Sequence, residues 1–177
     1  GPMARFGLDY ESLRAGRDDL LMISMPLYGQ TGPWASYMGY GHVLQAAAGY
    51  NHLTGWEDGP PIGTGVAYTD FLVPHIAATA LIAALDYRRR TGKGQYIDFG
   101  QLEAGVHGLW TAIVDWTADG HEQTRLGNHD PDAAPHNAYQ CRDGKWVVVA
   151  CATEKHWEGL KAALGRPVRL ENDANCF

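Results

Sequence analysis

Residues 67–103 read AYTDFLVPHIAATALIAALDYRRRTGKGQYIDFGQLE. Apolar side chains fill most of Phe71–Leu85 too continuously for a surface stripe, so we expect a helix that is largely buried. Three arginines close this helix, where cations favour the negative end of its dipole. Gly92 then suits the left-handed position that follows a helix. Gln95–Phe99 reads as a strand, and the succession of helix and strand predicts an α/β fold.

Asp70 stands at the mouth of that helix, at the end of a glycine-rich approach that runs from Gly59 to Gly65. An aspartate in this place can act as an N-cap, with its carboxylate facing the unpaired amides of the first turn. From the residues alone, a capping role and a chemical role for Asp70 both stay open.

The segments before and after this stretch supply the other elements of the predicted fold. Leu20–Met25 reads as a buried strand that Pro26 ends, and Gly39–Ala48 reads as a helix that ends at Gly49. Gln101–Ala118 reads as a second long helix. Its apolar residues at helical spacing indicate a core face, and they are Val106, Leu109, Trp110, Ile113 and Trp116.

A different unit is expected towards the end of the chain. Ala138–Cys141 and Trp146–Cys151 read as the two strands of a hairpin, with turn residues between them. Glu154–Leu164 reads as an amphipathic helix with Thr153 as its N-cap. This pattern predicts a small α+β unit of a hairpin and a helix.

Residues 120–137 are polar and lack periodicity, which indicates a linker or an active-site loop. No metal site is predicted, because neither the histidines of this segment nor the cysteines of the chain have metal-ligand spacing. These residues are His121, His129, His136, Cys141, Cys151 and Cys176.

Composition narrows the class of protein. Of the 177 residues, 45% are hydrophobic and 19% are charged, which is typical of a globular chain. The net charge of −6 disfavours a nucleic-acid-binding function. Phe71–Tyr87 has nearly the length of a membrane span, but Pro74, His75 and Asp86 interrupt it, so no membrane association is expected. No signal peptide is recognisable, and we expect a cytoplasmic protein.

Asp70, Arg88 and the segment Thr91–Gln95, followed by Ile97-Asp98, form a pattern that resembles the central region of the class III CoA-transferases, the CaiB/BaiF family. Further matching positions are Tyr28-Gly29-Gln30-Thr31-Gly32-Pro33, Thr54-Gly55, Pro60-Pro61, Ala83-Ala84-Leu85, Asp143-Gly144 and Trp157. The resemblance spans roughly residues 10–167 and rests on the combination of these motifs.

The resemblance implies part of a Rossmann-like large domain followed by a small α+β domain. On that basis residues 3–119 are the central part of the large domain, residues 120–137 are a linker or active-site loop, and residues 138–177 belong to the small domain. The family builds its large domain from both ends of a longer chain, so this chain is expected to be a middle section. Two chains of the family interlock as rings, which implies a homodimer.

The resemblance also implies a reaction and the residues that carry it. Asp70 matches the family's nucleophile, which attacks an acyl-CoA thioester and passes through an aspartyl-CoA thioester before a carboxylic acid accepts the CoA. The amides of the helix start after Asp70 are expected to hold the oxyanion. Tyr40 and Gln30 match positions near the bound ligand, so coenzyme A or acyl-CoA is the expected substrate.

Two alternative functions stay open at this stage. One alternative is an α-methylacyl-CoA racemase or CoA-lyase relative on the same scaffold. In the racemases a catalytic histidine occupies the position of Tyr40, so this tyrosine favours transfer over racemisation. His42 lies two residues further, about 200° around a helix. Gly41 departs from the aspartate that usually follows this tyrosine. The other alternative is a non-catalytic truncated piece that needs a partner chain to cover its apolar helices.

Overall fold

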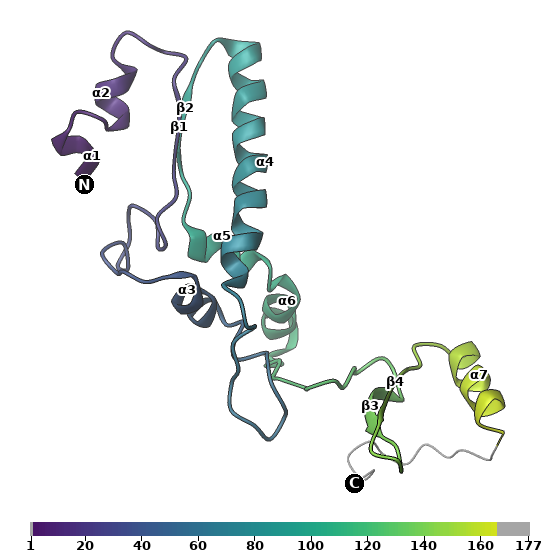
Figure 1. Ribbon diagram of the computed structural model, residues 1–177. Coiled ribbons are helices and arrows are strands. Elements are labelled where there is room, and N and C mark those ends of the chain that lie inside the picture. The colour runs from purple at the N-terminus through teal and green to yellow at the C-terminus, as the bar shows by residue number, and fades with distance from the viewer. Residues whose placement is uncertain (1, 166–177) are drawn as a thin grey trace. The chain divides into compact units, whose positions relative to one another are not determined.

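The computed structural model describes residues 2–165, and they form a mixed α/β structure (Figure 1). The described chain divides into two compact units. The first holds the residues up to 54 together with 61–123, and the second holds 55–60 together with the residues from 124 onward. The helices of the first unit that do not border the predicted site are α1 (Pro2–Arg5), α2 (Tyr10–Arg14) and α6 (Trp110–Asp119).

Two parallel strands form the sheet of the first unit, as the sequence predicted. β1 (Leu21–Ser24) pairs with β2 (Gln95–Asp98), from Leu21 opposite Gln95 to Ser24 opposite Asp98. Gly94 is required just before β2, because its amide donates to the carbonyl of Asp18 at 2.6 Å and a Cβ there would overlap the Leu20 carbonyl. The chain therefore comes closest to the start of β1 where no side chain is present.

Helix α4 (Tyr68–Thr91) lies between the two strands in the chain, and its C-terminal end is as predicted. Gly92 has φ of 73°, and its amide donates to the Arg88 carbonyl at 2.8 Å. The predicted N-terminus is wrong. Ala67 is the N-cap residue and Asp70 lies in the first turn, so Asp70 does not cap the helix.

The prediction that this helix is largely buried is also wrong within the described residues. Only Thr69, Val73, Ala77 and Ala84 of α4 are buried. The reason is that its neighbours there, α3 (Gly41–Ala48), α5 (Gln101–His107) and β1, contact it along one side. Helix α4 is long and apolar enough to cross a membrane by length and composition, with 22% of its most apolar window buried. Core helices can have the same length and composition, so a single such helix is weak support for a membrane span.

The predicted helix Gln101–Ala118 is interrupted, and the structure has α5 and α6 in its place. The hydroxyl of Tyr50 donates to the Gly105 carbonyl at 2.8 Å. A Cβ on Gly108 would overlap that hydroxyl and come within 2.8 Å of the Leu72 side chain. Tertiary contact with Tyr50 thus accounts for the glycine and for the break at Gly108-Leu109, which periodicity alone does not reveal.

The core of the first unit lies where α3, α4 and α5 meet. Leu44 and Val73 are fully buried there, together with the polar side chains of Gln45 and Thr69. The expectation that the aromatic residues of α6 lie in the core is wrong in this chain, since Trp110 is 61% and Trp116 is 59% exposed.

The second unit confirms the predicted hairpin and helix. β3 (His136–Gln140) and β4 (Trp146–Ala150) are antiparallel, and β3 begins two residues earlier than predicted. Helix α7 (Glu154–Leu164) has the predicted bounds, and the Thr153 hydroxyl accepts the His156 amide at 3.3 Å as its N-cap. The segment Gly55–Pro60 joins this unit because the Gly127 amide donates to the Gly55 carbonyl at 2.8 Å.

Candidate functional site

A cleft of about 420 Å³ lies in the first unit beside the carboxyl ends of the two parallel strands. Ligands of open α/β sheets bind at this edge, where the loops that leave the strands converge. The loops here are joined by backbone hydrogen bonds, from Gln101 to Pro26 at 3.1 Å and from Leu102 to Leu27 at 2.8 Å. The cleft is lined by Met25, Leu27, Gly39, Tyr40, Gly41, Asp70, Val73, Pro74 and Gln101.

Asp70 contributes the carboxylate of this cleft from the first turn of α4. The side chain is exposed, and within the described part of the chain its carboxylate accepts no hydrogen bond. The positive end of the helix dipole favours an anion in this turn. Asp70 therefore presents an accessible carboxylate that no cation or internal donor engages among the described residues, which suits a nucleophile.

The start of helix α3 forms the wall opposite this carboxylate. Tyr40 is its N-cap residue, makes no side-chain capping bond and is 83% exposed. Its carbonyl accepts the amides of Val43 and Leu44 at 2.9 and 3.0 Å. Among the described residues the amides of Gly41 and His42 donate to no partner, so they are available to an acceptor in the cleft.

The predicted oxyanion donors, the amides after Asp70, do not fit this geometry. Because α4 begins at Tyr68, the amides that follow Asp70 lie inside the helix and are directed to carbonyls of the preceding turn. The first turn of α3 offers free amides beside the same cleft instead. Sequence reasoning missed this because the helix start was placed three residues too late.

The structure brings Tyr40 and Asp70 to one cleft but leaves Gln30 outside its lining. The backbone amide of Gln30 donates to both carboxylate oxygens of Asp98, at 3.2 and 3.1 Å. Its side-chain amide donates to the Ser24 hydroxyl at 2.6 Å. Gln30 thus connects its loop to the ends of both strands. Gln101, which the sequence did not single out, lines the cleft instead, and its side-chain amide donates to the Met25 carbonyl at 2.8 Å.

Gln45 is a second residue that sequence reasoning missed. It is 1% exposed, and its side-chain oxygen accepts the Tyr68 amide at 3.0 Å at the first residue of α4. A glutamine between apolar residues of a short helix was the available signal. Through this bond Gln45 positions the helical turn that carries Asp70.

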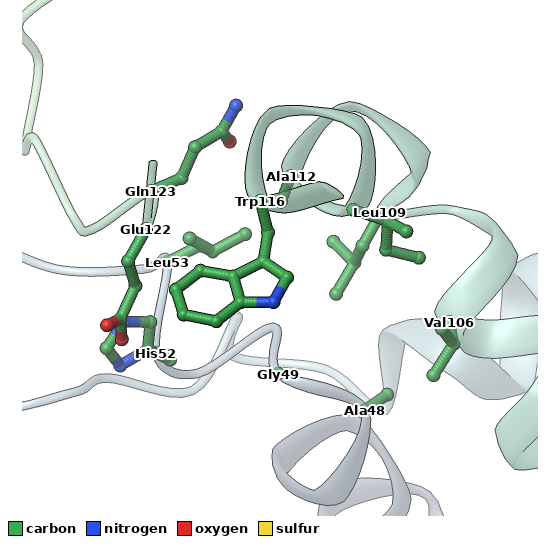
Figure 2. Close-up of a pocket in the computed structure, with 11 residues that line it drawn as sticks. Ala48, Gly49, His52, Leu53, Val106, Leu109, Ala112, Trp116, Glu122 and Gln123 are labelled. Carbon is green, nitrogen blue, oxygen red and sulfur yellow. The ribbon is translucent and has the colours of Figure 1, made fainter. Parts of the chain in front are cut away.

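A larger cavity of about 510 Å³ lies between the end of α3 and α6, away from Asp70 (Figure 2). Its lining is mostly apolar, and Figure 2 shows the Trp116 ring beside Leu53 and Gly49. His52 and Glu122 form an exposed pair at 3.5 Å on one side of it. The Glu122 carboxylate is paired with His52, whereas the Asp70 carboxylate accepts no hydrogen bond among the described residues, so the Asp70 cleft is the candidate site despite its smaller volume.

No group of three or more histidine, cysteine or acidic side chains lies close enough to hold a metal ion in the described ranges. Cys141 is exposed and Cys151 is buried, and both are free. Cys176 lies outside the described residues.

A family model described as CoA-transferase family III matches residues 1–176. The chain therefore belongs to this family, as its motifs predicted. It is 34% identical over 167 residues to succinyl-CoA–D-citramalate CoA-transferase of Chloroflexus aurantiacus, covering 94% of this chain and 42% of that protein. It is 34% identical over 163 residues to succinate–glutarate CoA-transferase of Agrobacterium fabrum, covering 92% and 40%.

The crystal structure of a CAIB/BAIF family protein from Brucella suis has the same fold, with a TM-score of 0.83 and 34% identity over 93% of this chain and 43% of that one. The chain thus spans about two fifths of the length of the curated relatives it matches.

Proposed function

We propose that the full-length protein transfers CoA from an acyl-CoA to a carboxylic acid, with Asp70 as the nucleophile. The observation that carries this proposal is the exposed, unbonded carboxylate of Asp70 in a cleft at the carboxyl ends of the parallel strands. The names of the matched relatives, which pair succinyl-CoA with citramalate and succinate with glutarate, support dicarboxylic acids as substrates.

The reaction is a series of acyl transfers to and from Asp70. An Asp70 oxygen attacks the thioester carbonyl, the carbon–sulfur bond breaks, and CoA leaves as a thiolate, which gives a mixed anhydride. The thiolate then attacks the Asp70 carbonyl, releases the donor acid as a carboxylate and leaves an aspartyl-CoA thioester. The acceptor carboxylate attacks this thioester and expels CoA as a thiolate, which gives a second mixed anhydride. The thiolate then attacks the acceptor's carbonyl carbon, which yields the new acyl-CoA and frees the Asp70 carboxylate.

The residues around Asp70 have separate roles in this proposal. The free amides of Gly41 and His42 stabilise the negative oxygen that develops at each attack. Tyr40 borders the cleft as a contact for CoA. Gln30 holds the loop that follows β1 through Ser24 and Asp98, so its effect on CoA binding is indirect.

The wider architecture is part of the same proposal. Residues 3–119 belong to a Rossmann-like large domain, residues 120–137 form a linker or active-site loop, and residues 138–177 belong to a small domain. The protein acts as a homodimer in the cytoplasm. Because the chain spans about two fifths of its relatives, activity is assigned to the full-length protein and none to residues 1–177 alone.

The test replaces Asp70 in the full-length protein. Asp70→Ala should lower turnover with succinyl-CoA and an acceptor acid by at least about 10³-fold, as expected for a covalent nucleophile. Mass spectrometry of the unmodified protein should find a CoA adduct on Asp70 in the presence of succinyl-CoA, and a hydroxamate there after hydroxylamine is added. Normal turnover by Asp70→Ala would reject the proposal.

A matched control lies on the same helix. Asp86 is exposed and pairs with Arg90 at 2.8 Å on the surface, so Asp86→Asn removes a carboxylate with little effect on stability. This variant should keep its turnover and acquire no adduct.

A further inference from the structure

Gly41 is in contact with the proposed nucleophile. It is the first residue of α3 and is buried. A Cβ at this position would overlap the Asp70 carboxylate and come within 2.6 Å of the Ala67 Cβ, whereas non-bonded carbons approach to about 3.5 Å. The Asp70 carboxylate therefore lies directly against the backbone of Gly41, in space that any other residue would fill.

The backbone of Gly41 is also fixed from the side of α4. The hydroxyl of Thr69, which is fully buried, donates to the Gly41 carbonyl at 3.4 Å. Thr69 and Asp70 are neighbours in the first turn of α4. In this turn Thr69 binds the backbone of Gly41, and Asp70 places its carboxylate against the same backbone. The hydrogen bond from Thr69 therefore opposes movement of the start of α3 away from α4.

We propose that Gly41 is a positioning residue for Asp70, because its missing side chain lets the carboxylate lie against the start of α3 beside the free amides of that helix. This inference rests on the proposed function. The missing side chain acts only by orienting Asp70, which is separate from the role proposed for the Gly41 amide.

A methyl group at position 41 has two separable consequences. The carboxylate of Asp70 is the end of a flexible side chain, so it would rotate out of its place and lose its orientation toward the thioester. The Ala67 Cβ is attached directly to the backbone, so relief there requires the starts of α3 and α4 to separate, which lowers stability. Removing the Ala67 methyl group relieves the second conflict and leaves the first.

The experiment compares Gly41→Ala, Ala67→Gly and the double variant in the full-length protein. Melting temperature, kcat, KM for succinyl-CoA and the yield of Asp70 adduct are measured for each. Gly41→Ala should lower kcat about 10²-fold, the loss expected for a reacting group displaced by about 1 Å. KM should change less than kcat, and the melting temperature should fall. The double variant should regain most of the melting temperature that Gly41→Ala loses, but not its kcat or adduct yield.

Gly159→Ala is the control, because Gly159 lies in α7 and a Cβ there meets nothing within 4 Å. It should retain both stability and turnover. The inference is overturned if Gly41→Ala keeps wild-type kcat, or if the double variant regains kcat together with its melting temperature, which would mark Gly41 as structural only. If Gly41→Ala does not fold, kcat of the double variant is compared with that of Ala67→Gly. A lower kcat in the double variant supports the inference, and an equal kcat overturns it. Loss of activity in Asp70→Ala with full activity in Gly41→Ala rejects this inference alone, whereas an active Asp70→Ala rejects the proposed function.

Discussion

Replacing Gln45 tests how the helix that carries Asp70 is positioned. The side-chain oxygen of Gln45 accepts the Tyr68 amide at 3.0 Å and the Thr64 hydroxyl at 3.2 Å. Its amide group donates to the Asn51 side-chain oxygen at 3.1 Å. One nearly fully buried side chain thus joins α3, the approach to α4 and the first residue of α4.

The loss of stability in Gln45→Leu depends on which hydrogen bonds the three partners of Gln45 keep. The Tyr68 amide and the Thr64 hydroxyl keep the Val66 carbonyl as an acceptor, at 2.8 and 2.9 Å. Only the bond to Asn51 is lost without replacement, and a typical net hydrogen bond contributes about 1 kcal/mol. Because the hydrogen bonding of the Tyr68 amide and the Thr64 hydroxyl is also weakened, the free energy of unfolding should fall by about 1 to 2 kcal/mol.

Gln45→Glu should cost more at pH 7, by about 3 kcal/mol or more, because it buries an unpaired charge that faces the Asn51 oxygen. Burial raises the pKa of the introduced carboxyl group above its unfolded value. The neutral form is therefore favoured in the folded state, so the destabilisation is present above the folded-state pKa and recedes as the pH falls through it.

Urea unfolding of the full-length protein at pH 7 and pH 5 measures these differences. The Glu variant should be the less stable of the two at pH 7, and the gap should narrow at pH 5. Gln140→Leu and Gln140→Glu are the controls, since Gln140 is exposed and should change stability by less than about 0.5 kcal/mol. Equal stabilities of the two Gln45 variants at pH 7 would refute the reasoning, because the introduced carboxylate would then carry no penalty for its burial beside the Asn51 oxygen.

Three further outcomes are expected. Gly94→Ala should lower the free energy of unfolding by about 1–3 kcal/mol in thermal melts, because its methyl group would overlap the Leu20 carbonyl; an unchanged melting temperature contradicts this. Tyr50→Phe should cost about 1 kcal/mol at neutral pH through the lost bond to Gly105. Burial raises the pKa of Tyr50, so the stability it contributes is fully present below its ordinary pKa and is lost as pH rises through the folded-state value; unfolding measured from pH 8 to 12 should lack this loss in the variant. A 2-methylacyl-CoA incubated with the full-length protein in deuterated water should gain no α-deuterium, because Tyr40 rather than an imidazole borders the cleft. Rapid exchange of the α-hydrogen would favour a racemase.

The features that sequence predicted correctly are those that depend on neighbouring residues. Thr153 and the amphipathic pattern after it define α7, because an N-cap bond forms within one turn. Gly92 ends α4 since a left-handed residue is needed there whatever surrounds it. The strands at β1 and β2 were equally readable from short apolar runs between turn residues.

The features that sequence reasoning placed wrongly depend on residues far apart in the chain. Helix α4 begins at Tyr68 rather than after Asp70 because Gln45, on another helix, accepts the Tyr68 amide. The helix predicted from Gln101 breaks at Gly108 because the Tyr50 hydroxyl bonds to the helix backbone just before it.

The sequence by itself determined the α/β class and the family, because local patterning, caps and motif spacing are written in consecutive residues. It also singled out Asp70 as the candidate nucleophile, which stays a prediction. Only the tertiary structure decided where Asp70 lies in its helix and that its carboxylate rests against Gly41. The physical reason is that van der Waals exclusion and buried hydrogen bonds act between atoms that touch, and these two residues come into contact only when α3 packs on α4.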